Sequence, residues 1–143
     1  MSRQVLVPVD ASEQSTAALE FAIDNYPEAT IVALHAIDPG DFPSGGFEAG
    51  AFTDFERFRE NYEEEAEALL EDAAELATDA GVDVETVIET GRPSKTIVSY
   101  AEDNDVDHIV IGSHGRTGAS RLLLGSVAET VTRRSTVPVT IVR

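Results

Sequence analysis

The chain of 143 residues contains no cysteine and no tryptophan. Without cysteine it can form neither a disulfide scaffold nor a thiolate metal site. It also lacks a long hydrophobic run, since the apolar stretch near the N-terminus, residues 5–9, is flanked by Arg3 and Asp10. Such a stretch is too short for a signal peptide or a membrane span. We therefore expect a cytoplasmic protein with no membrane partner.

Basic residues are scarce in this sequence. The chain has 27 acidic and 10 basic residues, a formal net charge of −17, and Lys95 is its single lysine. Nucleic acid would repel so acidic a protein, so it is not expected as a partner. An acid excess with few lysines indicates a surface adapted to a high-salt cytoplasm, where salt screens self-repulsion. An unusually acidic protein from a low-salt cell is the alternative.

The charge is unevenly distributed along the chain. Residues 1–111 carry 26 acids and 5 bases, a net charge of −21, whereas residues 112–143 carry one acid and five arginines, a net charge of +4. If the protein binds an anion, the field of its charges favours this last segment.

Apolar, strand-like segments alternate with helical segments. The predicted strands are residues 4–10, 30–37, 82–91, 107–112 and 137–143. The predicted helices are residues 11–26, 53–80, 92–106 and 120–135, and a loop rich in glycine and proline covers residues 38–52. Continuous apolar strands separated by helices predict a single α/β domain over residues 1–143, with a doubly wound parallel sheet and helices on both faces.

Two helix ends carry recognisable signals. Ser12 is placed to cap the first helix, and Gly81 is placed to end the second.

The second helix, residues 53–80, holds 11 acids and two arginines. Cation binding is one interpretation of the acid run, and a solvated helix face is the other, which we favour because no ligand cluster falls on one turn.

The densest run of glycine is "GSHGRTGASRLLLGS", residues 112–126, directly after the buried strand "HIVI". Glycine lets backbone N–H groups approach a ligand closely, and successive N–H groups near a helix N-terminus bind anions. The loop matches neither a Walker A motif, which needs a lysine, nor a dinucleotide fingerprint, which belongs after the first strand. An anion site of another kind is therefore expected at the carboxyl end of the fourth strand.

The spacing Gly112-x2-Gly115-x9-Gly125-Ser126 resembles the nucleotide-binding branch of the universal stress protein family. "VPVD" at 7–10, "LHAID" at 34–38 and "PVTIV" at 138–142 extend the resemblance over the whole chain. The resemblance implies strand order 3-2-1-4-5. It also implies that ATP, or AMP or ADP, lies across the carboxyl ends of the first and fourth strands, with Mg²⁺ or Mn²⁺ possible as a bridge between phosphates.

The resemblance also implies site residues. Pro8, Val9 and Asp10 would flank the nucleoside, and Ala36 would contact adenine through its backbone. The residues implied around ribose and phosphates are Gly112, Ser113, His114, Gly115, Arg116, Thr117, Gly125, Ser126 and Val127. No catalytic residue and no protein metal ligand is assigned.

Plainer roles remain open for these residues. Asp10 could merely cap the first helix, the glycines could serve turns, and His114 and Arg116 could be solvated. His35 and His108 are expected to be satisfied by neighbouring groups rather than to act at the site.

The leading functional hypothesis is an ATP-binding sensor or regulator in stress response, paired as a homodimer through residues 137–142. The first alternative is a slow ATPase or nucleotide-dependent enzyme. At most weak ATP hydrolysis is expected, because no lysine near the loop could stabilise the charge on the γ-phosphate. The second is a nucleotide-free interaction module of the same fold. A monomer whose sheet edge is blunted by Pro138 and Arg143 is the alternative to the dimer.

Overall fold

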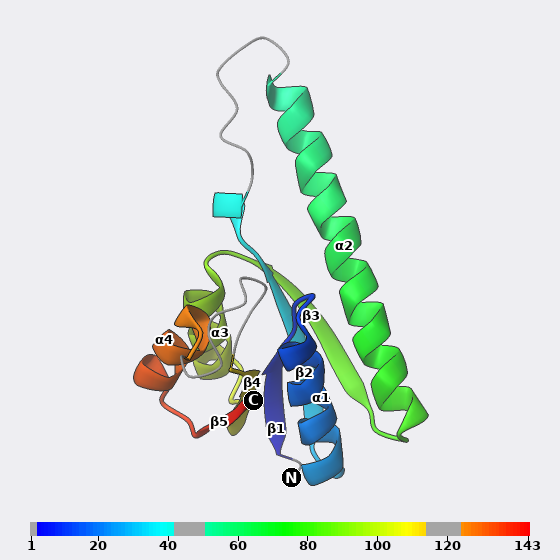
Figure 1. Cartoon of the computed structure of the whole chain (residues 1–143), viewed down its shortest axis with the longest axis vertical. Coiled ribbons are helices and arrows are strands. Elements are labelled where there is room, and N and C mark those ends of the chain that lie inside the picture. The colour runs from blue at the N-terminus through cyan, green and yellow to red at the C-terminus, as the bar shows by residue number, and fades with distance from the viewer. Residues whose placement is uncertain (1–2, 42–50, 114–123) are drawn as a thin grey trace.

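The computed structural model describes residues 3–41, 51–113 and 124–143, with side chains from residue 56 onward in the second range. Its centre is a five-stranded sheet of order β3-β2-β1-β4-β5, in which all neighbouring strands are parallel (Figure 1). The strands are β1 (Gln4–Pro8), β2 (Thr30–Ile37), β3 (Val84–Thr90), β4 (His108–Gly112) and β5 (Val139–Val142). The predicted class and strand order are confirmed.

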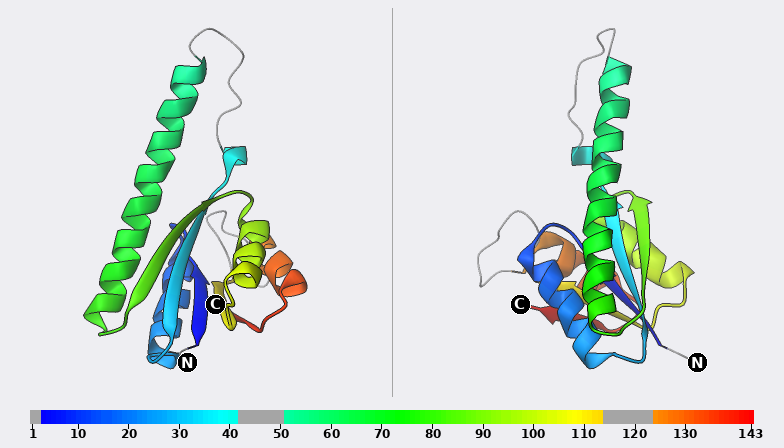
Figure 2. Two further views of the ribbon diagram at one scale, coloured as in Figure 1. Left: turned by 180° about the vertical axis from the view of Figure 1, so that it is seen from behind. Right: turned by 90° about the vertical axis from the view of Figure 1, so that its right-hand side faces the viewer.

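Helices cover both faces of this sheet, as Figure 2 shows from two further sides. They are α1 (Glu13–Asn25), α2 (Ala51–Asp79), α3 (Pro93–Asp103) and α4 (Ser126–Arg134), and a short 3₁₀ helix, η1 (Pro39–Asp41), follows β2. Helices α1 and α2 pack on one face, and α3 and α4 on the other. The sheet is therefore doubly wound, as predicted.

Alternate residues of each strand serve opposite layers of the core. In β2, Ile31 and Ala33 pack with α1 and α2, whereas Val32 and Leu34 pack with α3 and α4. All four are at most 1% exposed. Burial on both faces explains why β1, β2 and β4 are largely continuous apolar runs, whereas the more exposed β3 contains Glu85 and Glu89. Each buried Val, Leu or Ile side chain contributes about 1.5–3 kcal/mol.

The predicted signals at two helix ends are confirmed. The Ser12 hydroxyl accepts a hydrogen bond from the Ser15 N–H at 3.2 Å and so caps α1. Gly81 follows α2 with φ of +74°, and the Gly81 N–H donates to the Thr78 carbonyl at 2.9 Å. Glycine reaches this left-handed conformation without a Cβ penalty.

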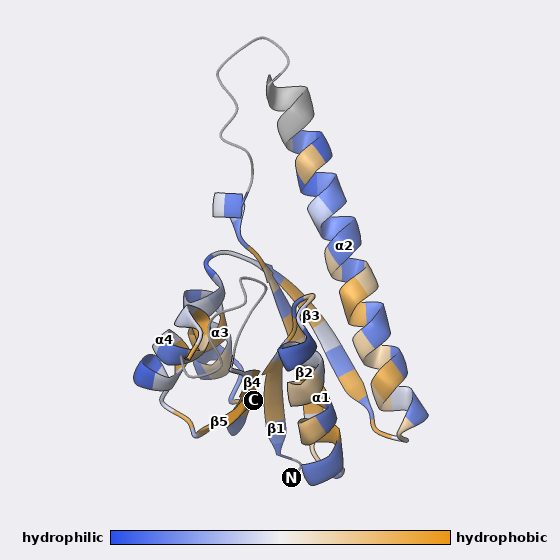
Figure 3. Cartoon of the chain, in the orientation of Figure 1, coloured by the Kyte–Doolittle hydropathy of each residue, from blue (hydrophilic) through white to orange (hydrophobic). Residues whose placement is uncertain are grey.

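Helix α2 supports the solvated interpretation of its acid run. Its N-terminal half extends beyond the sheet in Figure 1. In Figure 3 the coloured part of that half is mostly hydrophilic, and apolar residues are more frequent toward the C-terminal end of α2. Of the acids whose side chains are described in α2, all but Glu63 are exposed. Within the described ranges no group of three potential metal ligands occurs, and no helix is both long and apolar enough to cross a membrane.

The start of α4 differs from the prediction. The helix was predicted over residues 120–135, but Leu124 and Gly125 precede it, and residues 120–123 lie outside the described part. Gly125 is the N-cap, with extended φ and ψ of −61° and 153°. Leu124 packs on the core although it lies outside the helix, so its apolar character suggested a helix that begins earlier. Glycine is unfavourable inside a helix and is accepted at an N-cap, which agrees with the position of Gly125.

Candidate functional site

A cavity of about 880 Å³ opens at the carboxyl ends of β1, β2 and β4. β1 has β2 on one side and β4 on the other, so the chain reverses its direction of winding there. Such switch points are where open α/β sheets bind ligands. The predicted residues that line the cavity are Pro8, Val9, Asp10, Ala36, Gly112, Ser113, Gly125, Ser126 and Val127. The other four, His114, Gly115, Arg116 and Thr117, lie outside the described residues.

Asp10 shapes the turn from β1 into α1. Its Oδ1 accepts hydrogen bonds from the Ser12 N–H, at 2.7 Å, and from the Ser12 hydroxyl. Ser12, not Asp10, is the N-cap residue of α1. Asp10 therefore contributes to the cap only indirectly, through its hydrogen bonds to Ser12. In the described structure Oδ2 of Asp10 has no hydrogen-bond partner, which leaves one carboxylate oxygen available at the cavity.

Ala36 presents backbone polar groups to the cavity. Alternate residues of a strand between two parallel neighbours direct their N–H and C=O groups to opposite sides. The Leu34 carbonyl accepts from the Val9 N–H at 2.8 Å, and the Ile37 carbonyl accepts from the Gly91 N–H at 2.9 Å, so even-numbered residues of β2 face β1 and odd-numbered ones face β3. β1 ends at Pro8, opposite Leu34. The Ala36 groups therefore point past the end of β1, where no described backbone group pairs with them.

The N-terminus of α4 forms another wall of the cavity. The Ser113 N–H donates to the Val142 carbonyl at 2.8 Å, and the Gly125 N–H donates to the Ser113 carbonyl at 2.6 Å, which fixes where α4 begins. Gly125 has no side chain to cap the first turn, so the N–H groups of Ser126 and Val127 lack the side-chain acceptor that α1 has.

Ser113 adds a buried hydroxyl to this wall. The residue is 5% exposed, and no hydrogen-bond partner of its hydroxyl occurs in the part of the chain that the structure describes. A buried polar group without a partner is rare in folded proteins and calls for a ligand or a water molecule. The uncapped first turn and this hydroxyl together suit an oxygen-rich, anionic group.

Both described histidines make the contacts expected of them. Nδ1 of His35 lies 2.7 Å from the Val9 carbonyl oxygen, and Nε2 of His108 lies 2.6 Å from the Thr140 hydroxyl. His35 nevertheless lines the cavity, whereas His108 does not.

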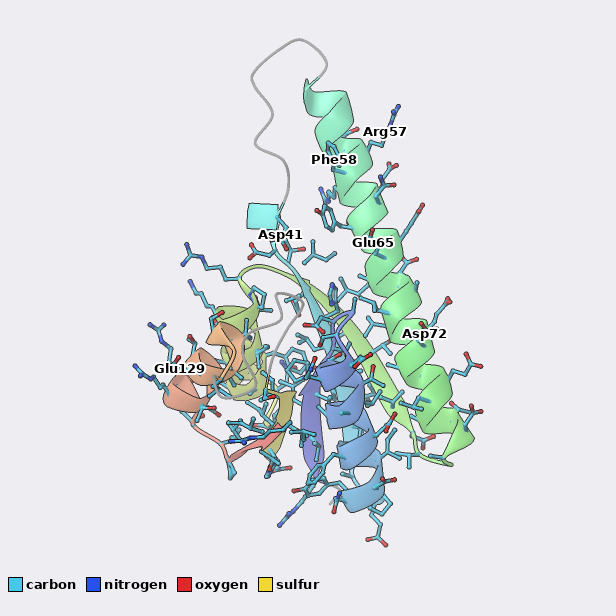
Figure 4. All side chains as sticks on the ribbon, in the orientation of Figure 1. Asp41, Arg57, Phe58, Glu65, Asp72 and Glu129 are labelled. Atoms are coloured by element: carbon cyan, nitrogen blue, oxygen red, sulfur yellow. The ribbon has the colours of Figure 1, made fainter. Side chains whose placement is uncertain are left out.

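The wall that α2 and η1 provide was not predicted from the sequence. Tyr62, Glu65 and Asp72 of α2 line the cavity, as does Asp41 of η1. Figure 4 labels Glu65 and Asp72 on α2 and Asp41 on η1. The Tyr62 hydroxyl donates to the Asp41 carbonyl at 3.1 Å and ties the two elements together. Apolar and aromatic residues of α2, Tyr62 among them, recur three to four positions apart, which is typical of a helix that packs on one face. This spacing does not reveal which element that face meets.

The described wall is acidic. Five acids line the cavity, namely Asp10, Asp38, Asp41, Glu65 and Asp72, and no lysine or arginine is among its described lining residues. Arg116 and Arg121 of the basic segment lie outside the described residues. The acids along the α2 side would therefore repel an anionic ligand in this cavity, whereas the helix dipole at the N-terminus of α4 would attract it.

Known proteins match this chain over its full length. MJ0577 of Methanocaldococcus jannaschii, a universal stress protein, is 33% identical over 155 residues that cover 100% of this chain and 96% of that protein. A solved structure of MJ0577 has a TM-score of 0.84 and covers 99% of this chain and 96% of that chain. YxiE of Bacillus subtilis, also a universal stress protein, is 32% identical over 148 residues, 100% of both chains. A solved universal stress protein in complex with cAMP is 29% identical, with a TM-score of 0.72, and covers 99% of this chain and 97% of that one.

A family model confirms the assignment. The model described as the universal stress protein family matches residues 1–143. The strand order, the motif spacing and these matches agree with one another, so the chain belongs to the universal stress protein family.

Proposed function

We propose that this protein binds adenine nucleotides, ATP among them, in the cavity at the ends of β1 and β4, and acts as a homodimeric sensor or regulator in stress response. The observation that carries the proposal is the combination of the Ala36 backbone edge with the buried Ser113 hydroxyl beside the α4 N-terminus, neither of which has a partner among the described residues. The relative solved with cAMP supports an adenine-containing ligand.

Each part of a nucleotide has a counterpart in the cavity. The Ala36 N–H donor and C=O acceptor suit the N1 acceptor and N6 amino donor of adenine. The Asp10 carboxylate accepts from ribose hydroxyls, with Pro8 and Val9 beside the nucleoside. Phosphates lie against Gly112, Ser113, Gly125, Ser126 and Val127, where the N–H groups of α4 point toward negative charge. We assign His114, Gly115, Arg116 and Thr117 to the same end of the ligand on the motif alone.

A divalent cation would bind together with the nucleotide, coordinated by its phosphates. The acids of the cavity wall do not form a three-ligand group among the described residues. Mg²⁺ typically keeps several waters and is held largely by substrate phosphates. Bound in that way, Mg²⁺ or Mn²⁺ would offset charge that the acidic wall otherwise opposes.

The homodimer would form through residues 137–142. The Pro138 carbonyl accepts from the Ile109 N–H at 3.0 Å and the Val142 carbonyl from the Ser113 N–H at 2.8 Å, so even-numbered residues of β5 face β4. The N–H and C=O groups of Val139 and Ile141 then face outward from the sheet edge. Pro138 lacks its N–H on the inner side, so it does not blunt the outer edge. Half-buried Val139 and Ile141 make an edge suited to pairing with a second copy.

Isothermal titration calorimetry with ATP, AMP and GTP tests the ligand. With Mg²⁺ and at molar KCl, we expect ATP to bind with a micromolar Kd, about −8 kcal/mol, and GTP to bind more weakly. A parallel titration with ATP and EDTA shows the share contributed by the cation. Absence of heat with millimolar ATP, in protein whose fold is verified by circular dichroism, would refute nucleotide binding.

A further inference from the structure

We infer that His35 is a positioning residue, which holds the Val9 carbonyl and so keeps the backbone edge of Ala36 open for the base of the ligand. This inference rests on the proposed function for its ligand, but its structural part concerns the unliganded protein. His35 lies between the last sheet residue that pairs with β1 and the residue whose edge faces the cavity.

The β1–β2 ladder stops at a specific bond. The Val9 N–H donates to the Leu34 carbonyl at 2.8 Å, which is a regular ladder bond. In a parallel ladder the next bond would run from the Ala36 N–H to the Val9 carbonyl. That bond is absent from the described structure, and Nδ1 of His35 lies 2.7 Å from the same carbonyl oxygen. The imidazole therefore binds the carbonyl oxygen with which the Ala36 N–H would otherwise pair.

The chemistry of this contact fixes the tautomer of His35. A carbonyl oxygen only accepts hydrogen bonds, so Nδ1 must carry the proton in the contact with Val9. In the described part of the chain, Nε2 has no partner. The hydrogen bond is thus available in both the neutral and the charged form of the ring, since Nδ1 is protonated in both.

His35 approaches the Val9 carbonyl from the side of the sheet that α1 and α2 cover. Odd-numbered residues of β2 point toward α1 and α2, whereas Ala36 belongs to the layer of α3 and α4. The side chain thus acts on the Val9 carbonyl from beneath the sheet edge, and the base lies beyond that edge. Its effect on the ligand passes through the backbone of Val9 and Ala36.

An open Ala36 edge gives the site its base preference. Adenine offers an acceptor at N1 and a donor at N6, which complement an N–H and a C=O on one strand edge. Guanine reverses both groups, with N1–H and O6. If the Ala36 N–H closed on the Val9 carbonyl, the edge would lose its donor, and discrimination between the two purines would fall. His35 therefore determines specificity through the backbone of Val9 and Ala36.

Hydrogen exchange of the Ala36 amide tests the structural part without any ligand. In the wild type we expect this amide to exchange rapidly, because it has no acceptor in the described part of the chain. His35→Leu frees the Val9 carbonyl, so the Ala36 N–H should pair with it and exchange at least about tenfold more slowly. His35→Asn is the matched control, because its Nδ2 is attached at the same γ position as Nδ1 of histidine and should keep the wild-type rate. Equal rates in all three proteins would overturn the inference.

The tautomer can be measured in the wild type alone, should a variant fail to fold. Nitrogen-15 spectra at pH 8 should show His35 protonated at Nδ1. Protonation at Nε2 would overturn the inference, because the contact with Val9 could then not be a hydrogen bond.

Calorimetry tests the consequence for the ligand. We expect His35→Leu to weaken ATP binding at least tenfold while the affinity for GTP stays within twofold, and His35→Asn to restore the preference for ATP. An unchanged ATP-to-GTP ratio in His35→Leu, with a slowed Ala36 amide, would contradict the specificity role. If the wild type binds no nucleotide, the proposed function fails, whereas the exchange rates and the tautomer still decide what His35 does to the backbone.

Discussion

Gly112, the last residue of β4, lies directly against the backbone of Gln14 in the first turn of α1. A Cβ on Gly112 would be 2.7 Å from both the carbonyl carbon and the carbonyl oxygen of Gln14. Real Cβ atoms do not approach a backbone so closely, and a backbone cannot move aside as the end of a flexible side chain can. The packing of β4 on α1 therefore requires glycine here, independently of any ligand that approaches the loop.

Gly112→Ala should destabilise the fold, because either α1 or the end of β4 must shift. Overpacking of this kind costs about 1–3 kcal/mol, and urea unfolding measures it. Gly125→Ala is the matched control. Gly125 has an ordinary negative φ of −61°, so alanine there should cost less than about 1 kcal/mol. Equal losses in the two variants would contradict the packing argument.

Gly125→Val should abolish nucleotide binding and leave the fold largely intact. The branched side chain would stand at the start of α4, where phosphates are proposed to lie, while the extended backbone of Gly125 accommodates valine. Calorimetry with ATP measures the binding, and circular dichroism verifies the fold. Normal ATP affinity in a folded Gly125→Val protein would show that phosphate does not approach α4.

Ile141→Pro should convert a dimer into a monomer without unfolding the chain. The Ile141 N–H faces outward from β5, so proline removes a donor from the outer edge and none from the β4–β5 ladder. Light scattering should give twice the chain mass of 15.3 kDa for the wild type and one chain mass for the variant.

Thr140→Pro is the matched control for the sheet edge. Thr140 faces β4, so proline at this position removes an inner ladder bond and should lower the free energy of unfolding by about 1–3 kcal/mol. A wild-type mass of one chain at tens of micromolar protein would end the dimer proposal.

Stability should fall as the pH drops through the titration of His108. Burial, and to a lesser degree the charge of Arg3, lower the pKa of His108 below its ordinary value of about 6.5. The unfolded chain therefore binds a proton more readily than the folded one. The contribution is fully present above about pH 6.5 and is lost as the pH falls through the lower, folded pKa.

His108→Gln isolates this titration, because its amide can still pair with the Thr140 hydroxyl. Urea unfolding at pH 7.5 and 5.5 should show a smaller loss of stability on acidification in the variant than in the wild type. The same loss in both proteins would assign the pH dependence to other groups.

Salt should stabilise this protein strongly. With a net charge of −17, self-repulsion is substantial at low ionic strength, and it is screened over about 10 Å at 0.1 M salt. The melting temperature should rise between 0.1 and 2 M KCl. In the triple variant Glu64→Gln, Glu67→Gln, Glu71→Gln, which removes exposed charges of α2, the rise should be smaller. A melting temperature independent of KCl would argue against adaptation of this surface to high salt.

The sheet was predictable because each buried strand is an apolar run, and the strand order followed from the motif resemblance. The walls of the cavity were only partly predictable. Residues in or beside the glycine motif, such as Ser113 and Gly125, were identified as site residues by the motif itself. The role of Ala36 as an open edge depends on where β1 stops relative to β2, which is a matter of register between distant segments. The contribution of Tyr62 depends on how α2 crosses the sheet, and helical spacing carries no such information.

The hydrogen bonds that join Val142, Ser113 and Gly125 also constrain the order in which the molecule can be made. Domains begin to fold while the chain is still being synthesised from its N-terminus. Strands β1, β2 and β3 and their helices are complete by residue 103 and can associate early. The Ser113 N–H, however, finds its acceptor only when residue 142 has emerged, and Ser113 in turn anchors the start of α4. A nascent chain would therefore hold a nearly finished sheet and no finished binding site until its last strand is in place.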